Sequence, residues 1–242
     1  MSYSKHATGV LCDNRNAGLD LILDLKAIGA LSSGNISDIE DLRLRGILVF
    51  NHATMLVAAE HNQIEVMKWL HRYGCGVYDH SAEGAIANGH TEAIKLLYDW
   101  GCRFTWRSAG LAAEYNQFET LKLLTSLGAF KTHHTASNLA MHDNFDNIMW
   151  TLNNGYRADN VWNSAAAHGQ LDVLIKAKDK IPREGGILCR MMYYVYCEAK
   201  DNRHVNVMRW IRDNMFDAGI SDGSWGPYFV NTINKDIEEI EK

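Results

Sequence analysis

The residues best suited for chemistry in this 242-residue chain are acidic side chains that recur at a nearly fixed interval. They are Glu65, Glu92, Glu119, Asp146 and Asp172. A row of carboxylates could bind a metal ion or transfer protons. A carboxylate is also expected in the first turn of a helix, where it interacts favourably with the helix dipole and with unpaired N–H groups. Because the acidic residue repeats together with its surrounding segment, we favour the structural interpretation.

Cysteine and histidine residues are the next candidates for a metal site. Cys75 and Cys102 occupy equivalent positions in neighbouring segments. Packed helices lie about 8 to 10 Å apart, beyond the roughly 7 Å Cα separation that a disulfide allows, so we interpret both residues as buried thiols. The 11 histidines, among them His133, His134 and His142, form no His-x-x-x-His with a glutamate, and the chain has no Cys-x-x-Cys. We therefore expect no metal and no cofactor.

Sequence motifs of common enzyme classes are also missing. The chain contains no glycine-rich phosphate loop and no Gly-x-Ser-x-Gly elbow. The sequence therefore predicts a protein that is not an enzyme. An enzymatic alternative stays open only if Asp, His and Cys side chains from different repeats converge in space.

Composition and charge limit the classes of partner. The formal net charge is -5, the pI is near 6.1 and the 24 Lys and Arg residues are scattered, which argues against a nucleic-acid partner. No window approaches the roughly 18 apolar residues of a membrane span, and the N-terminal residues lack the apolar centre of a signal peptide. The 5 cysteines are an odd number at irregular spacing, which is typical of a reducing compartment. We expect a cytoplasmic protein with no membrane partner.

The elements that carry these residues come from a repeated segment. The stretch HNQIEVMKWLHRYG of residues 61–74 returns 27 residues later as NGHTEAIKLLYDWG. Two further steps of 27 reach residues 115–128 and 142–155. Looser copies lie at 34–46, 168–181 and 202–215. A fixed period of this length indicates a stack of similar units.

Each copy predicts two helices joined by a tight turn. Apolar residues spaced by three or four indicate the second helix, which ends at Gly74, Gly101, Gly128 or Gly155. A Ser or Thr precedes it at a constant position and is predicted to be the N-cap of the first helix; these residues are Thr54, Ser81, Ser108 and Thr135. Small residues in the first helix permit close stacking of neighbours: Ala58, Ala85, Ala112 and Ala165. The 2 prolines leave the helices uninterrupted, so we expect an all-α fold.

The stretch GHTEAIKLL of residues 89–97, with Gly101 twelve residues after Gly89, resembles the second-helix signature of ankyrin repeats. Residues 52–181 carry the resemblance best. The usual Thr-Pro-Leu-His opening is replaced by sequences such as HSAE, and the period is 27 instead of about 33. This compact form is similar to ankyrin repeats common in large DNA viruses and some protists. For a viral protein, the cytoplasm would be that of the host cell.

The resemblance implies an ankyrin-type helical solenoid of about seven helix-turn-helix repeats with short loops. It further implies non-catalytic binding of another protein on the concave face that the loops and first helices form. The repeat step predicts an array over residues 1–216 and a C-terminal turn and helix over 217–242. The predicted repeats are 19–46, 52–74, 79–101, 106–128, 133–155, 160–181 and 186–215.

The C-terminal segment places apolar residues on one face of a helix that could begin at Pro227. These residues are Val230, Ile233, Ile237 and Ile240. The last repeat of an array needs a cover for its apolar face, so we favour a capping helix over a partner-binding helix.

The loops that follow the second helices vary most between repeats and are therefore predicted to contact the partner. Aromatic residues and arginine dominate the centres of protein interfaces. The predicted partner-binding residues are Tyr78, Phe104, Trp106, Phe130, Tyr156 and Arg157. Alternatively, several of these aromatic residues pack between repeats. The predicted function is that of an adaptor for a protein partner, and the alternative is a self-associating scaffold or virion component.

Overall fold

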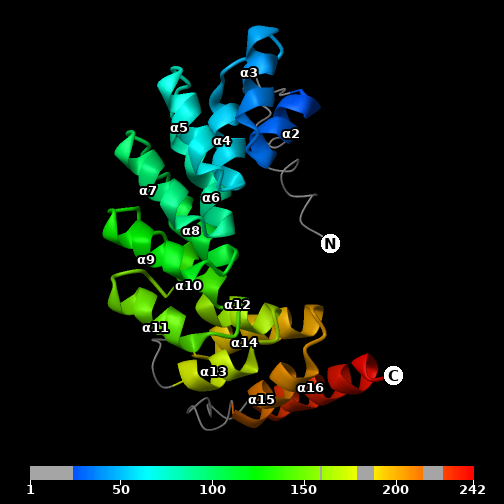
Figure 1. Ribbon diagram of the computed structural model, residues 1–242. Coiled ribbons are helices and arrows are strands. Elements are labelled where there is room, and N and C mark those ends of the chain that lie inside the picture. Colours follow the sequence, from blue (N-terminus) through cyan, green and yellow to red (C-terminus); the bar gives the residue numbers. More distant parts are fainter. Residues whose placement is uncertain (1–23, 159, 179–187, 215–225) are drawn as a thin grey trace. The chain divides into compact units, whose positions relative to one another are not determined.

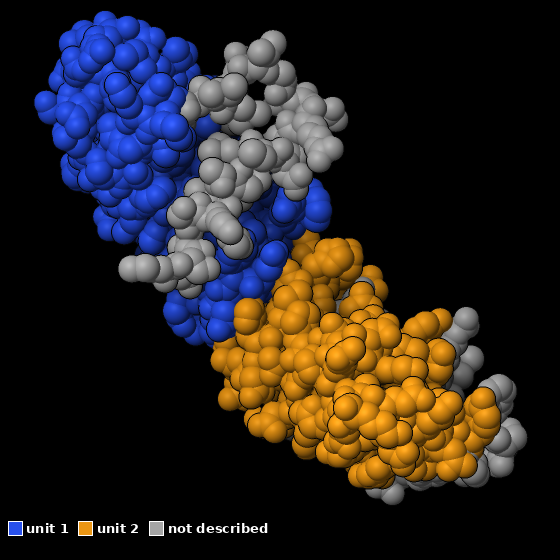
Figure 2. Space-filling model, turned by 90° about the vertical axis from the view of Figure 1, so that its right-hand side faces the viewer, with its two compact units in different colours: residues 1–130 blue, residues 131–242 orange. Residues whose placement is uncertain are grey.

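The computed structural model describes residues 24–158, 160–178, 188–214 and 226–242 (Figure 1). Within these ranges the regular structure consists of helices, and no strand is found. The chain divides into two compact units, residues 1–130 and 131–242, which are coloured separately in Figure 2. The predicted all-α class is confirmed. Parts of the predicted segments lie outside the described residues: 1–23 at the start of the array, 179–181 of the sixth repeat, 186–187 and 215 of the last repeat, and 217–225 of the C-terminal segment.

From residue 24 onwards, the helices of unit 1 form four successive pairs of a first and a second helix. The first helices are α2 (Leu25–Ser33), α4 (His52–Glu60), α6 (Glu83–Asn88) and α8 (Ser108–Glu114), with the 3-10 helix η1 (Asp79–Ala82) leading into α6. The second helices are α3 (Ile36–Leu44), α5 (Ile64–Arg72), α7 (Thr91–Asp99) and α9 (Phe118–Ser126). Neighbouring first helices pack directly against one another, and they lie side by side in Figure 1.

Unit 2 continues the same alternation and ends with one further helix. Its first helices are α10 (His134–Leu139), α12 (Val161–Ala167) and α14 (Leu188–Asp201). Its second helices are α11 (Phe145–Asn153), α13 (Leu171–Ala177) and α15 (Val205–Asn214), and α16 (Gly226–Ile240) packs on α15. The first helices again contact their neighbours in the order α10, α12, α14.

Small buried residues let the first helices approach closely. The recurring alanines of this helix are completely buried: Ala58, Ala85, Ala112 and Ala165. Glycine ends the second helices as predicted, because the backbone turns there into the left-handed region that glycine adopts without a steric penalty. The φ angles are +86° at Gly74, +97° at Gly101, +80° at Gly128 and +82° at Gly155.

A polar connection between successive repeats was not predicted from the sequence. The residue just before four of the second helices, α5, α7, α13 and α15, donates a side-chain N–H to a backbone carbonyl at or near the end of the first helix of the preceding repeat. The pairs are Gln63 with Ser32 (2.7 Å), His90 with Glu60 (3.0 Å), Gln170 with Met141 (2.8 Å) and His204 with Ala167 (2.9 Å). This bond satisfies a carbonyl that the helix end leaves unpaired.

Helix α16 covers the last repeat with an apolar face and a buried polar contact. Ile233 and Ile237 are buried, as predicted, while Val230 and Ile240 are half-buried. Helix α16 thus packs on α15, where the C-terminal cap was predicted. The sequence reading did not identify Asp236, which is also buried and accepts hydrogen bonds from the Tyr196 hydroxyl and, at 2.9 Å, from Lys200 Nζ. The opposite face of α16 exposes Tyr228 together with the polar residues Asn231, Lys235 and Glu238.

Candidate functional site

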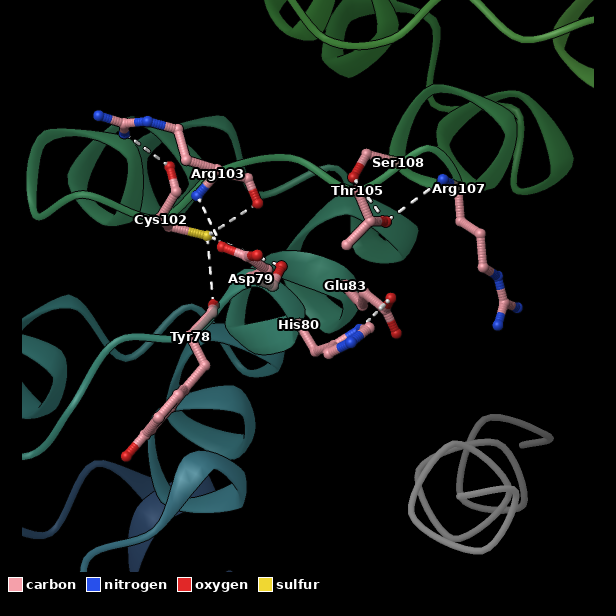
Figure 3. Close-up of polar contacts among 9 residues, drawn as sticks. All are labelled: Tyr78, Asp79, His80, Glu83, Cys102, Arg103, Thr105, Arg107 and Ser108. Carbon is pink, nitrogen blue, oxygen red and sulfur yellow. Dashed lines mark hydrogen bonds and ion pairs between the residues drawn. The ribbon is translucent and has the colours of Figure 1, made fainter. Parts of the chain in front are cut away.

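The returning loops of unit 1 are fastened to one another by buried thiols. Cys102 Sγ donates to the carbonyl of Tyr78 at 3.3 Å, and Cys75 Sγ contacts the carbonyl of Asn51 at 3.9 Å (Figure 3 shows the first pair). Burial raises the pKa of both thiols to about 11, so each stays protonated and can donate. The structure thus assigns both cysteines a structural role between repeats, in agreement with the prediction of buried thiols.

The recurring Ser and Thr residues shape the start of each first helix, although not as N-caps. The N-cap of α4 is Asn51, and Thr54 is its third residue. The Thr54 hydroxyl accepts the backbone N–H of Asn51 at 3.2 Å, and Ser81 accepts that of Tyr78 at 3.0 Å. The prediction of N-caps is therefore wrong: Thr54 and Ser81 lie three positions after the N-cap, because the hydroxyl satisfies the backbone before the helix and not the first turn itself. Ser108 and Thr135 are the first residue of α8 and the second residue of α10.

Further bonds fix the loop between α7 and α8. Asp79 Oδ1 accepts the backbone N–H of Arg103 at 3.3 Å, and Thr105 Oγ1 accepts that of Arg107 at 3.3 Å (Figure 3). At the start of the preceding first helix, His80 Nδ1 of η1 lies 2.9 Å from Glu83 Oε1 of α6. In Figure 3 the guanidinium groups of Arg103 and Arg107 point to different sides of the loop, so these side chains do not converge on a pocket.

The structure separates the six predicted partner-binding residues into an exposed and a buried group. In unit 1 the exposed fractions are 50% for Tyr78, 62% for Trp106 and 64% for Phe130. In unit 2 Arg157 is exposed. Phe104 and Tyr156 are only 7% and 4% exposed. Their side chains therefore pack between repeats and present no surface to a partner.

The register of the repeat explains this division. The residue directly after the left-handed glycine is buried in every regular repeat: Cys75, Cys102, Ala129 and Tyr156. The next residue is exposed each time: Gly76, Arg103, Phe130 and Arg157. Phe104 is held inside by its ring, which stacks on Tyr98 at a centroid distance of 5.6 Å. Comparison of equivalent positions would have placed Tyr156 in the core and added Arg103 to the exposed set.

The carboxylates that first suggested chemistry are dispersed along the second helices. Each lies in the first turn of its helix, as the structural interpretation predicted; they are Glu65, Glu92, Glu119, Asp146 and Asp172. Glu65 and Glu119 form ion pairs at 2.8 Å with Lys68 and Lys122 of the next turn. Across the part of the chain that the structure describes, His, Cys, Asp and Glu form no group of three or more that could hold a metal ion.

Comparison with known proteins gives one structural result. No family model matches the sequence, and no curated protein matches it either. Among solved structures, the fold is similar to the ankyrin repeat domain of Bcl-3, a member of the IkappaB protein family. The TM-score is 0.50 at 14% sequence identity, over 66% of this chain and 87% of that chain. The protein has an ankyrin-repeat fold.

The ankyrin-repeat fold accounts for the paired helices. The predicted ankyrin-type helical solenoid is confirmed. None of the helices in the described ranges combines the length and apolarity that crossing a bilayer requires. In an ankyrin-repeat fold, each repeat contacts mainly its neighbours, and side chains on the connecting loops can vary without disturbing the core.

Proposed function

We propose that this protein is a non-catalytic interaction module, or adaptor, that binds another protein with the loops and first helices of its repeats. The observation that supports this function is the exposure of Tyr78 and Trp106 on loops whose backbone is held in place. Large aromatic side chains that remain exposed on an ordered surface are typical of protein interfaces. The proposal includes a cytoplasmic location and a protein partner, with no role for nucleic acid or membrane.

The fixed loops favour this function on energetic grounds. If a loop becomes ordered only on binding, the loss of its conformational entropy weakens the affinity. This cost adds to the loss of translational and rotational freedom of the two proteins. Here Ser81 and Cys102 bond the backbone of Tyr78 on its two sides, and Thr105 bonds the backbone of Arg107 beside Trp106. Both aromatic side chains are thus presented by backbone that is already ordered.

Affinity capture from host-cell lysate, followed by binding measurements with the purified partner, tests the proposal. The test variant combines Tyr78→Ala, Trp106→Ala and Phe130→Ala. Tyr228→Ala is the matched control, because Tyr228 is 70% exposed and lies on α16 instead of a returning loop. We expect the test variant to lose at least about tenfold in affinity, the scale of an interface hot spot, and the control to bind as the wild type does. Circular dichroism confirms that both variants remain helical.

If the test variant and the wild type bind with equal affinity, the loops of unit 1 do not form the binding surface. Arg157→Ala is measured separately, because this residue belongs to unit 2. If only Arg157→Ala weakens binding, the loops of unit 2 contain the contact. Phe104→Ala is unsuitable as a test, since the loss of a buried ring would destabilise the fold itself.

The alternative function, a self-associating scaffold or virion component, predicts a mass that rises with concentration in light scattering. Apart from Tyr228, the exposed residues on the outer face of α16 are polar, among them Asn231, Lys235 and Glu238, and this face gives the alternative little support at the C-terminal end. If the protein captures only itself and its mass increases with concentration, the scaffold function replaces the adaptor.

A further inference from the structure

The chain contains two Asn–Gly sequences, Asn88–Gly89 and Asn154–Gly155. In such a pair the backbone nitrogen of glycine can attack the side-chain carbonyl carbon of asparagine, because glycine has no side chain to obstruct the approach. The new C–N bond closes a succinimide, and the side-chain nitrogen leaves as ammonia. Water then opens the ring to aspartate or isoaspartate. Either product replaces a neutral amide with a carboxylate.

The folded geometry at Asn88 opposes this attack. Asn88 is the last residue of α6, and its Nδ2 donates to the carbonyl of Gly84 at 2.9 Å. That bond directs the side chain back along the helix and away from Gly89. The Gly89 N–H donates to the carbonyl of Ile86 at 3.3 Å. Attack therefore requires the last turn of α6 to open, so that both bonds break.

The same two bonds are slightly shorter at Asn154. Its Nδ2 donates to the carbonyl of Trp150 at 2.8 Å, and the Gly155 N–H donates to the carbonyl of Leu152 at 3.0 Å. The following residue, Tyr156, is buried and donates its own N–H to a helix carbonyl at 3.1 Å. At Asn88 the following residue makes the equivalent bond, from the His90 N–H to the Ala85 carbonyl at 2.9 Å, but Asn88 is exposed and ends a helix of only 6 residues. Local opening is easier where fewer buried contacts hold the backbone.

We propose that Asn88–Gly89 is a site of spontaneous deamidation, controlled by opening of the last turn of α6, and that it reacts before Asn154–Gly155. The product places a negative charge at the C-terminus of α6, where the helix dipole disfavours it. It also removes the donor to Gly84. Isoaspartate further lengthens the backbone in a tight turn, where a Cβ on Gly89 would already lie 2.4 Å from Gln117 Oε1. Deamidation therefore loosens this repeat and changes the charge at the end of a first helix.

The test is incubation of the full-length protein at mildly alkaline pH, with and without denaturing urea, followed by peptide mapping by mass spectrometry. In urea both asparagines should convert at similar rates. In the folded protein we expect conversion at Asn88 at least about tenfold more slowly than in urea, equivalent to ~1.4 kcal/mol of local opening, and still more slowly at Asn154. The variant Gln117→Ala removes a contact of Gly89 and should accelerate the reaction at Asn88 alone. Asn88→Gln should eliminate the first product and leave conversion at Asn154 unchanged.

Three results would overturn the proposal. They are conversion at Asn154 before Asn88 in the folded protein, equal rates at Asn88 with and without urea, and absence of any Asn88 product from the folded protein. Acceleration at both sites by Gln117→Ala would also contradict it, because it would indicate global unfolding instead of opening of α6. The chemistry is read from peptide masses, so its outcome is independent of partner binding.

Discussion

The contact between Asp236 on α16 and Tyr196 on α14 is expected to hold the C-terminal cap in place. Both side chains are buried, and Lys200 donates to the same carboxylate. Burial and the hydrogen bond to Asp236 raise the pKa of Tyr196 above its usual value, so its hydroxyl remains a donor at neutral pH. The variant Tyr196→Phe removes this donor and preserves the ring that packs on Phe229.

The size of the stability loss in Tyr196→Phe follows from the charge and the burial of the acceptor, Asp236. A hydrogen bond to a charged group contributes about 1.5–3 kcal/mol, and its removal leaves a buried carboxylate with one donor fewer. We therefore expect Tyr196→Phe to lower the free energy of unfolding by about 2 kcal/mol at pH 7, measured by urea titration with circular dichroism. Tyr194→Phe is the matched control. Tyr194 is 49% exposed, so the expected change is within about 0.5 kcal/mol.

The pH dependence gives an independent test of the same contact. Burial alone would raise the pKa of Asp236, but hydrogen bonds from Tyr196 and Lys200 outweigh it and lower this pKa below its usual value. A carboxyl whose pKa is lower in the folded state stabilises the protein above its unfolded-state pKa of about 3.9, and this contribution is lost as the pH falls through the folded-state pKa. The difference between wild type and Tyr196→Phe should therefore shrink below about pH 4.

An undiminished difference at acid pH would refute this explanation, since it would show that the hydroxyl stabilises the fold without the charged carboxylate. A second variant, Asp236→Asn, keeps an acceptor for Tyr196 but cannot ionise. It should lose the part of the acid sensitivity that Asp236 causes. The argument also fails if Tyr194→Phe destabilises the protein as much as Tyr196→Phe does.

Other predictions concern the stacking and the ends of the repeats. Gln63→Ala removes the 2.7 Å bond to the Ser32 carbonyl and should lower the free energy of unfolding by about 1 kcal/mol in urea titrations. Burial raises the pKa of the Cys75 thiol to about 11, so at pH 8 it should react with iodoacetamide far more slowly in the folded protein than in urea. Gly101→Ala places a side chain on a residue with φ +97° and should lower the free energy of unfolding by about 1–2 kcal/mol in the same titrations. Gly29→Ala is the control. Gly29 lies within α2, and nothing lies within 4 Å of the added Cβ, so this variant should not be destabilised.

The sequence by itself determined the repeat, its helix pairs and their ends. The constant spacing of Gly74 and Gly101 identifies the ends of the second helices, because few other residues adopt a left-handed φ without strain. The recurring Glu65 and Glu92 could be interpreted as first-turn residues for a similarly local reason: a charge interacts with the dipole of its own helix. Features that depend on neighbours within about one helical turn are readable from the sequence pattern.

Only the tertiary structure decided which loop side chains face solvent and which polar groups meet between helices. Phe104 and Trp106 are two residues apart and equally suited to an interface, yet the first stacks on Tyr98 and the second is exposed. The contact of Tyr196 with Asp236 joins residues 40 positions apart and belongs to no repeat pattern. Both outcomes depend on the packing of helices from different parts of the chain, since burial and hydrogen bonding are set by neighbours in space.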